Sequence, residues 1–339
     1  MNMNARIRFT ILVILAISYV FIFCSCETSQ PTIKPMSQKK HQPNAKQPNP
    51  EVVAQTQARL KANLKILAGD IGERHVRRYD ALERARTFLE GKLKSYGYTP
   101  ALQSYEAGGK TVHNIEVEIK GKTTPDEIVI IGAHYDTVPG TPGADDNGTG
   151  TVGVLELARH FAKHQPKRTV RFVLFVNEEP PFFQTEKMGS LVYARRCASR
   201  KENIVGMLSL EMLGYYSDDK KSQTYPPGIG LFYPDTGNFI GFVGNPSSSA
   251  LNKNSQADFK KTIDFPNQRL TAPTMVTGVG FSDHWSFWQA GYKAIMVTDT
   301  AFMRNHHYHE PTDTPETIDY PRLTKVVLGL VGVVGGLID

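Results

Sequence analysis

Hydrophobic positions along the chain follow two alternating periods. Apolar side chains recur every three or four positions among charged ones, which predicts amphipathic helices, in residues 52–67 and 81–93. Strands covered on both faces are predicted by short, nearly continuous Val- and Ile-rich runs, at residues 115–119, 128–133, 170–176, 204–210 and 294–297. Further helical patterns occur at residues 150–164, 187–199, 283–289 and 321–337. Strands that alternate with helices predict one α/β domain, with a mostly parallel central sheet and helices on both faces.

The first 26 residues have the pattern of an export signal. Arg6 and Arg8 precede an apolar run at residues 9–24, which is too short for a confident membrane span. The run ends in a small residue followed by Cys26, which resembles a bacterial lipobox. The sequence therefore predicts an exported protein, periplasmic or at the cell surface, with lipid anchoring through Cys26. An ordinary cleaved signal and an uncleaved anchor are the alternatives.

Residues 27–50 have the composition of a flexible tether. They are rich in Pro, Gln, Ser, Asn and Lys and contain no aromatic residue. The whole chain has a formal net charge of +6, and residues 1–50 carry six Lys or Arg and one Glu, so they account for five of these charges. The basic balance therefore gives no argument for nucleic-acid binding, although it suits weak association with an anionic membrane. Residues 51–339 form the predicted folded domain.

Acidic and histidine clusters directly follow several of the hydrophobic runs. They read HYD at 134–136, GADDNGTG at 143–150, NEE at 177–179, LEM at 210–212 and HYHEPTD at 307–313. Because ligands of α/β sheets bind outside the carboxyl ends of the strands, we expect these clusters to meet at one rim. Together they supply enough oxygen and nitrogen ligands for two zinc ions, with one carboxylate left to act as a base. The pattern indicates a metal-dependent hydrolase.

The first two clusters each pair a candidate ligand with a second polar residue. His134 and Asp136 are two apart on an extended segment, so Asp136 can accept the ring N–H of His134 and orient it toward a metal. Asp145 and Asp146 are adjacent carboxylates, which are costly to crowd without a cation. We assign Asp146 as a ligand that bridges two metals. Either residue is also suited to a turn or to capping the following helix.

The next two clusters contain three glutamates. Glu178 and Glu179 are neighbours whose side chains diverge, so we assign Glu179 to zinc and Glu178 to the role of general base and then general acid. A solvated acidic turn is the alternative. Glu211 lies inside an apolar segment, where an unpaired carboxylate is costly to bury, and metal ligation is the simplest explanation.

The last cluster contains His306, His307 and His309. A loop with several histidines is often merely polar, and not all three can be ligands. His309 is preferred because of its spacing to Asp313.

The ordered series HYD, GADDNGTG, NEE, SLEM, SDH and YHEPTDT resembles the co-catalytic zinc peptidase family that includes bacterial leucyl aminopeptidase, aminopeptidase S and glutamate carboxypeptidase. The resemblance spans residues 134–314 and makes residues 51–339 the catalytic domain. It implies that two Zn²⁺ ions are held by His134, Asp146, Glu179, Glu211 and His309. It further implies that Glu178 is the general base, that Asp136 supports His134, and that Asp283 and His284 lie near the site.

Two features depart from the family pattern. The family commonly has Asp where this chain has Glu211, and the extra methylene shifts the carboxylate. Residues 180–190 also form a longer and more apolar link than usual. That link forms part of a substrate pocket or covers the edge of the sheet, and the sequence leaves both readings open.

The resulting prediction is a zinc aminopeptidase that cleaves peptide substrates. Three alternatives stay open: a glutaminyl cyclase, which uses one zinc, a carboxypeptidase, and a non-catalytic binding domain on the same fold. The full set of five candidate ligands favours hydrolysis. The sequence does not determine the oligomeric state or the preferred residue.

Overall fold

The computed structural model describes residues 48–339. The predicted leader at residues 1–26 and the tether at 27–50, apart from its last three residues, lie outside the described part. The helices are α2 (Pro50–Leu64), α3 (Tyr79–Ser95), α4 (Gly150–Phe161), α5 (Gly189–Ser199), α6 (Ser249–Thr262), α7 (His284–Gln289) and α8 (Tyr320–Ile338). The strands are β1 (Ala101–Ala107), β2 (Lys110–Ile119), β3 (Thr124–His134), β4 (Arg168–Phe175), β5 (Asn203–Glu211), β6 (Ile240–Gly244), β7 (Asn267–Thr271) and β8 (Ala294–Thr298).

The strands form one eight-stranded sheet in the order β1-β2-β4-β3-β5-β8-β6-β7. Its central strands β4, β3, β5 and β8 run parallel. Strand β2 runs antiparallel to both β4 and β1. At the other side, β6 runs antiparallel to β8 and parallel to β7. The predicted α/β domain is confirmed, with a parallel centre and antiparallel pairs toward both edges. The hydrophobic pattern does not predict β1, β6, β7 or α6.

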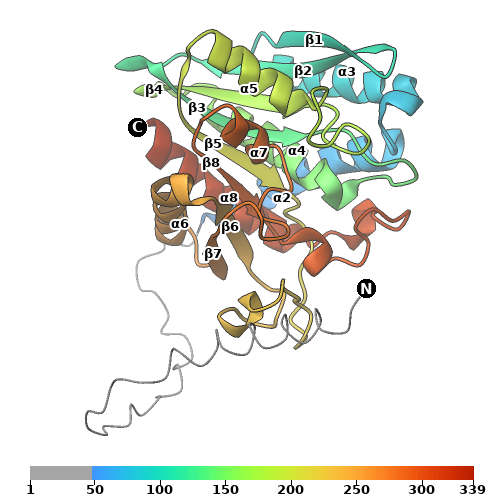
Figure 1. Ribbon diagram of the computed structural model, residues 1–339, viewed down its shortest axis with the longest axis vertical. Coiled ribbons are helices and arrows are strands. Elements are labelled where there is room, and N and C mark those ends of the chain that lie inside the picture. Colours follow the sequence, from blue (N-terminus) through green and yellow to red (C-terminus); the bar gives the residue numbers. More distant parts are fainter. Residues whose placement is uncertain (1–47) are drawn as a thin grey trace, which may run out of the picture. The chain divides into compact units, whose positions relative to one another are not determined.

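Helices cover both faces of the sheet, as Figure 1 shows. Side chains of β3 alternate between the two faces. Val129 and Ile131 pack in the larger core with residues of α2, α3, α4 and α8, whereas Ile130 packs in a smaller core with α5 and α7. The lone thiol of the described part, Cys197, is buried in the smaller core, where burial raises its pKa to about 12. This agrees with a packing role.

Helix α8 is long and apolar enough to cross a membrane, and it is the one such helix in residues 48–339. Asp319 caps its N-terminus, where the Asp319 side chain accepts the backbone N–H of Arg322 at 3.0 Å. Half of its most apolar stretch is buried, and its Val326, Val327 and Leu330 side chains belong to the core. The helix packs against α2, α4 and α6. Its apolar composition is thus accounted for by its place in the core.

A buried carboxylate joins α4 to α2. Glu156 of α4 accepts hydrogen bonds from Arg59 at 2.7 Å and from Arg159 at 2.8 Å. Burial would raise the pKa of Glu156, but the bonds from both arginines outweigh it and leave the pKa below the usual 4.5. The carboxylate therefore stabilises the fold fully above its unfolded-state pKa of about 4.5, and this stabilisation is lost as the pH falls through the lowered pKa of the folded state.

Replacement of Glu156 by Gln is expected to reduce the free energy of unfolding at pH 7 by about 2 kcal/mol, because hydrogen bonds to a charged group are lost. The difference should shrink at a pH below the lowered pKa of Glu156, where the wild-type carboxylate is protonated. Urea unfolding at both pH values measures it, with the exposed Glu310→Gln as control. Equal stability of the Glu156 variant and the wild type at pH 7 would contradict this assignment.

Candidate metal centre

Three neighbouring parallel strands deliver side chains to one rim of the sheet. Strand β3 ends at His134, β5 ends at Glu211, and Glu178 and Glu179 follow β4. The segment between β3 and α4 adds Asp146, whose peptide bond to Asn147 is cis. Ligand atoms of three of these side chains lie within 4.8 Å of one another and can hold one metal ion: His134, Asp146 and Glu179.

Asp146 faces a histidine with each of its oxygens. Its Oδ1 lies 3.5 Å from His134 Nε2, and the same nitrogen lies 3.4 Å from Glu211 Oε2. Its Oδ2 lies 3.1 Å from His309 Nε2, which in turn lies 3.4 Å from Glu179 Oε2. The five predicted ligands therefore form two sets, each with one histidine and one glutamate, that share Asp146.

These separations fit zinc. Two ligand atoms that each lie about 2.0–2.2 Å from a tetrahedral zinc are separated by roughly 3.3–3.6 Å, and the four distances at Asp146 are close to this range. Within the described residues, Glu179 Oε1 and His309 Nε2 are also buried without a hydrogen-bond partner of good geometry. A nitrogen and an oxygen left in this state are suited to a metal ion.

The charges in the cluster are poorly compensated by protein groups alone. Burial and the neighbouring Asp146 raise the pKa of Glu179 to about 8, and burial raises that of Glu211. Burial would lower the pKa of His309, yet Asp146 and Glu179 raise it to about 10. The pKa of His134 is likewise raised, by Glu211 and Glu178 against the effect of burial. The cluster therefore calls for positive charge, which protons or a divalent cation can supply.

Glu178 lies beside the two ligand sets and belongs to neither of them. Its backbone N–H donates to Asp136 Oδ1 at 3.1 Å, but no described side chain donates to its carboxylate. The nearest cationic atom is His134 Nε2, at 3.8 Å. Burial and the neighbouring Glu179 and Glu211 raise its pKa well above 4.5, against the opposing effect of His134. A buried carboxylate whose pKa is raised in this way is suited to accept and release a proton during a reaction.

Asp136 lies behind His134, on the side away from Asp146. Its Oδ1 is 3.5 Å from His134 Nδ1, longer than a normal hydrogen bond. Both of its oxygens also accept backbone N–H groups, from Glu178 and from Glu179 at 3.3 Å. One carboxylate thus faces the remote nitrogen of His134 and fixes the backbone of both glutamates.

Glu211 reaches the cluster despite its extra methylene. Its Oε2 accepts hydrogen bonds from Ser282 Oγ at 2.7 Å and from Asn147 Nδ2 at 3.1 Å. Asn147 also caps the start of α4, since its Oδ1 accepts the N–H of Gly150 at 3.1 Å. These contacts hold the carboxylate beside His134.

Asp145 points away from the five candidate ligands. Its carboxylate accepts hydrogen bonds from Gly214 N at 2.9 Å and from Asn305 Nδ2 at 2.8 Å. Asp313 holds the same loop from the other side, because its oxygens accept the N–H groups of Asp145 and Asp146 at 2.9 and 3.0 Å. The two adjacent aspartates therefore differ in environment, and Asp146 is the one in the cluster.

The two other residues predicted to lie near the site, Asp283 and His284, have different environments. Asp283 is buried, and burial raises its pKa to about 7, with His134 opposing and Glu211 adding to the rise. His284 instead donates to Val279 O at 2.7 Å, contacts the Trp288 ring and has a pKa lowered to about 4 by burial. His284 is thus not brought to the ligands. The two other histidines of the last cluster form hydrogen bonds away from the ligands, His306 with Tyr215 and His307 with Thr312.

Two residues near the centre, Arg74 and Tyr308, are not among the site residues predicted from the sequence. The fully buried guanidinium of Arg74 donates to four backbone carbonyls, at 2.5–3.1 Å, those of Gly72, Tyr135, Pro142 and Gly143. It thereby ties the end of β3 to the loop that carries Asp146. Tyr308 stacks on His309, with ring centroids 3.8 Å apart. Its place directly before that histidine is the signal that was available.

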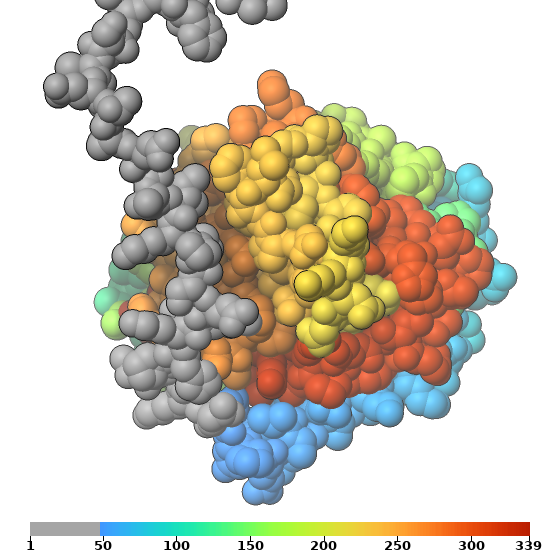
Figure 2. All heavy atoms as spheres, turned by 90° about the horizontal axis from the view of Figure 1, so that it is seen from below, coloured from blue at the N-terminus to red at the C-terminus, as the bar shows by residue number. Residues whose placement is uncertain are grey.

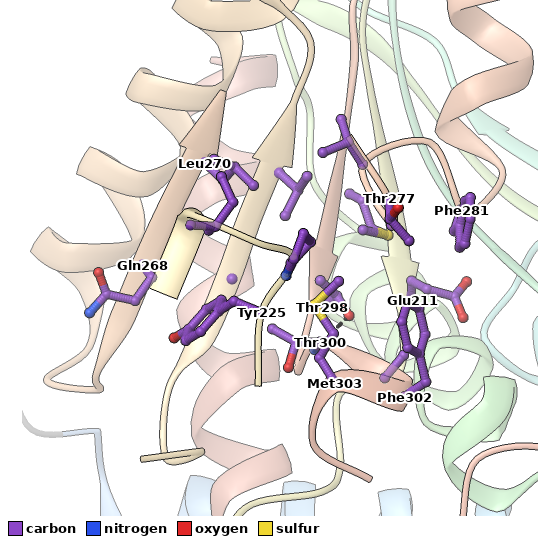
Figure 3. A pocket seen from close by; sticks show the side chains of 18 of the residues that line it. Glu211, Tyr225, Gln268, Leu270, Thr277, Phe281, Thr298, Thr300, Phe302 and Met303 are labelled. Atoms are coloured by element: carbon purple, nitrogen blue, oxygen red, sulfur yellow. Dashed lines mark hydrogen bonds between the residues drawn. The ribbon is translucent and has the colours of Figure 1, made fainter. Parts of the chain in front are cut away.

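An apolar cavity of about 90 Å³ opens beside Glu211. Figure 3 shows Glu211 at one end and Gln268 of β7 at the other, with Leu270, Phe302 and Met303 among the side chains between them. Its outer wall is the segment at residues 225–239, which lies beside residues 300–308 on the surface in Figure 2. Several waters would fill such a volume, since one needs about 10–15 Å³. The cavity has room for a large apolar side chain.

Comparisons with known proteins agree with this geometry. The chain matches the model of Peptidase family M28 over residues 114–334. A protein of Escherichia coli strain K12, itself described as uncharacterised, is 36% identical over 281 residues, which cover 80% of this chain and 85% of the relative. A probable aminopeptidase of Saccharomyces cerevisiae is 30% identical over 238 residues. That match covers 65% of this chain and 56% of the yeast protein, so this chain spans little more than half of that relative.

Solved structures show the same fold. A zinc aminopeptidase from Bacillus subtilis has a TM-score of 0.66 at 16% identity, over 82% of this chain and 94% of the other. A glutaminyl cyclase from Fimbriiglobus ruber has a TM-score of 0.61 at 21% identity, over 83% and 95%. At these identities the likeness is one of fold. The family match covers well over half of the chain, and the chain therefore belongs to peptidase family M28, the co-catalytic zinc peptidases that its motifs resemble.

Proposed function

We propose that this protein is a di-zinc aminopeptidase that removes large apolar residues from the N-terminus of peptides. Membership of family M28 supports the class, a zinc-dependent exopeptidase. The observation that carries the proposal is the pair of ligand sets that share Asp146, because each set supplies a histidine and a glutamate to its own ion. The apolar cavity beside Glu211 supports the residue preference.

Bound zinc and the surrounding residues have separate roles in the proposed reaction. Bound zinc supplies Lewis acidity and lowers the pKa of a water from 15.7 to about 7. Glu178 accepts the proton of the attacking water and passes it to the nitrogen of the leaving amine. Asp136 holds the backbone of Glu178 during both transfers. The carboxylates of Glu178 and Glu211 also give the cluster the negative charge that attracts a free α-ammonium group.

A glutaminyl cyclase is the alternative on the same fold. Such an enzyme uses one zinc, and the chain keeps both sets of ligand residues. A single zinc held by Asp146, Glu179 and His309 would leave His134 and Glu211 without a metal, although Asn147 and Ser282 hold Glu211 in place beside His134. The arrangement favours hydrolysis with two ions.

A panel of aminoacyl p-nitroanilides tests the proposal. Leu, Phe and Met derivatives are expected to be cleaved with kcat/KM about 100-fold above the Asp derivative, because an apolar wall cannot solvate a charge. N-acetyl-Leu p-nitroanilide is the matched control and should not be cleaved, since it has no free amine. Equal cleavage of the acetylated substrate would overturn the aminopeptidase assignment. A preference for the Asp derivative would overturn the proposed preference for apolar residues.

A further inference from the structure

A second pocket borders the ligand cluster, away from the apolar cavity. It has a volume of about 190 Å³ and is lined among others by Arg77, Asp136, Asn177, Glu179, Pro180 and Phe182. This second pocket borders the ligand cluster at Glu179, whereas the apolar cavity borders the cluster at Glu211. The pocket and the cavity share no lining residue. A peptide with its first side chain in the apolar cavity would therefore have the second pocket available to the residues after the cleaved bond.

Residues 180–182 form one wall of this pocket. They belong to the long apolar link that follows Glu179, for which the sequence left two roles open. Pro180, Pro181 and Phe182 line the pocket, so this part of the link contributes to a cavity beside the candidate centre. The turn that contains His75 and Arg77 also lines the pocket.

Arg77 brings an unmatched positive charge to the pocket. Its side chain is exposed and makes no ion pair or hydrogen bond within residues 48–339. Its neighbours differ: Arg78 and His75 both contact Glu73, at 2.7 Å. The pocket's own acids are occupied, because Asp136 accepts two backbone N–H groups and Glu179 faces His309.

The backbone of Arg77 is held in place. It lies in the short 3-10 turn Val76–Arg78, whose first residue follows His75, and His75 Nδ1 accepts the N–H of Arg77 at 3.1 Å. Arg74, one residue before His75, is bonded to the end of β3 and to the loop of Asp146. The turn is therefore attached to the same segments that carry the candidate ligands.

We propose that this pocket binds the leaving part of the substrate and that Arg77 binds a carboxylate there. The proposal rests on the aminopeptidase function. The carboxylate is either the C-terminus of a dipeptide or an acidic second side chain, and a guanidinium pairs with both in the same geometry. The substrates favoured by this pocket are thus short or acidic peptides with an apolar first residue.

Kinetics of the full chain and its Arg77→Gln variant test this. For Leu-Gly, we expect KM to rise by about 5- to 10-fold, as a charge-assisted pair is lost, with Leu-Gly amide and Leu p-nitroanilide unchanged. If the second side chain is the source, the same rise appears for Leu-Asp amide instead. Arg78→Gln, which removes a cation already paired with Glu73, is the matched control and should leave all four substrates unchanged.

The outcomes separate the two proposals. Normal KM values of Arg77→Gln for both Leu-Gly and Leu-Asp amide overturn the carboxylate site while the aminopeptidase stands. A wild-type chain that binds zinc but does not cleave Leu p-nitroanilide overturns the aminopeptidase, and the carboxylate site with it.

Discussion

Replacement of Glu178 by Gln is expected to lower kcat by about 10³-fold, within the usual range for loss of a general acid–base group. Gln keeps the shape of Glu but cannot accept a proton. The carboxylate of Glu178 is buried, receives no hydrogen bond from a described side chain and lies 3.8 Å from His134 Nε2. Glu178 belongs to neither of the two ligand sets that share Asp146, so the zinc content of the variant should stay at the wild-type value.

The pH profile gives this prediction a second readout. Glu178 acts as a base in its ionised form, so kcat of the wild type should fall as the pH drops through the pKa of Glu178, which its burial raises. The residual activity of the Gln variant should lack that acidic limb. Glu310→Gln, on the loop of His309 but exposed, is the matched control. A Glu178 variant with more than a tenth of the wild-type kcat would remove this residue from its role.

Replacement of Asp146 by Asn is the second large effect. Each Asp146 oxygen faces a different histidine, so the amide, with one oxygen and an NH₂ group, loses a ligand to one ion and places a donor against it. We expect zinc content to fall from two ions per chain toward one. Activity should fall by more than the roughly 10–100-fold that is typical when a residue supporting a metal ligand is lost. Elemental analysis and kcat/KM measure both effects.

The adjacent Asp145 provides the control for Asp146. Its hydrogen bonds to Gly214 and Asn305 are structural, so Asp145→Asn should reduce the free energy of unfolding by about 1–3 kcal/mol while zinc content is retained. The opposite pattern, with zinc lost from the Asp145 variant and kept by the Asp146 variant, would reverse the assignment of the pair.

The parallel centre of the fold was predictable because its strands are buried on both faces. Strands β3, β4, β5 and β8 therefore carry continuous Val- and Ile-rich runs. Candidate ligands end β3 and β5, and another follows β4. The edge strands β1 and β7 are mostly exposed or half-buried, so no such run marks them. Strand β6 is buried but has only five residues, two of them glycine.

The hydrogen bonds that hold the candidate ligands in place could not be predicted from the sequence. Arg74 bonds to carbonyls more than 60 positions away, and Asp313 accepts N–H groups from residues more than 160 positions away. No local pattern encodes such contacts. For the same reason the sequence left either aspartate of the 145–146 pair suited to a turn or cap, whereas the partners of Asp145, Gly214 and Asn305, lie in other segments. Candidate ligands were accessible because strand ends gather them at one rim.

The zinc stoichiometry of the full chain is the most direct test of the di-zinc centre. The protein is purified without chelator and analysed for metal before and after zinc addition. Two zinc ions per chain, with aminopeptidase activity that rises and falls with the second ion, is the predicted result. A single zinc that supports full activity, or no zinc even after its addition, would contradict the two ligand sets that meet at Asp146.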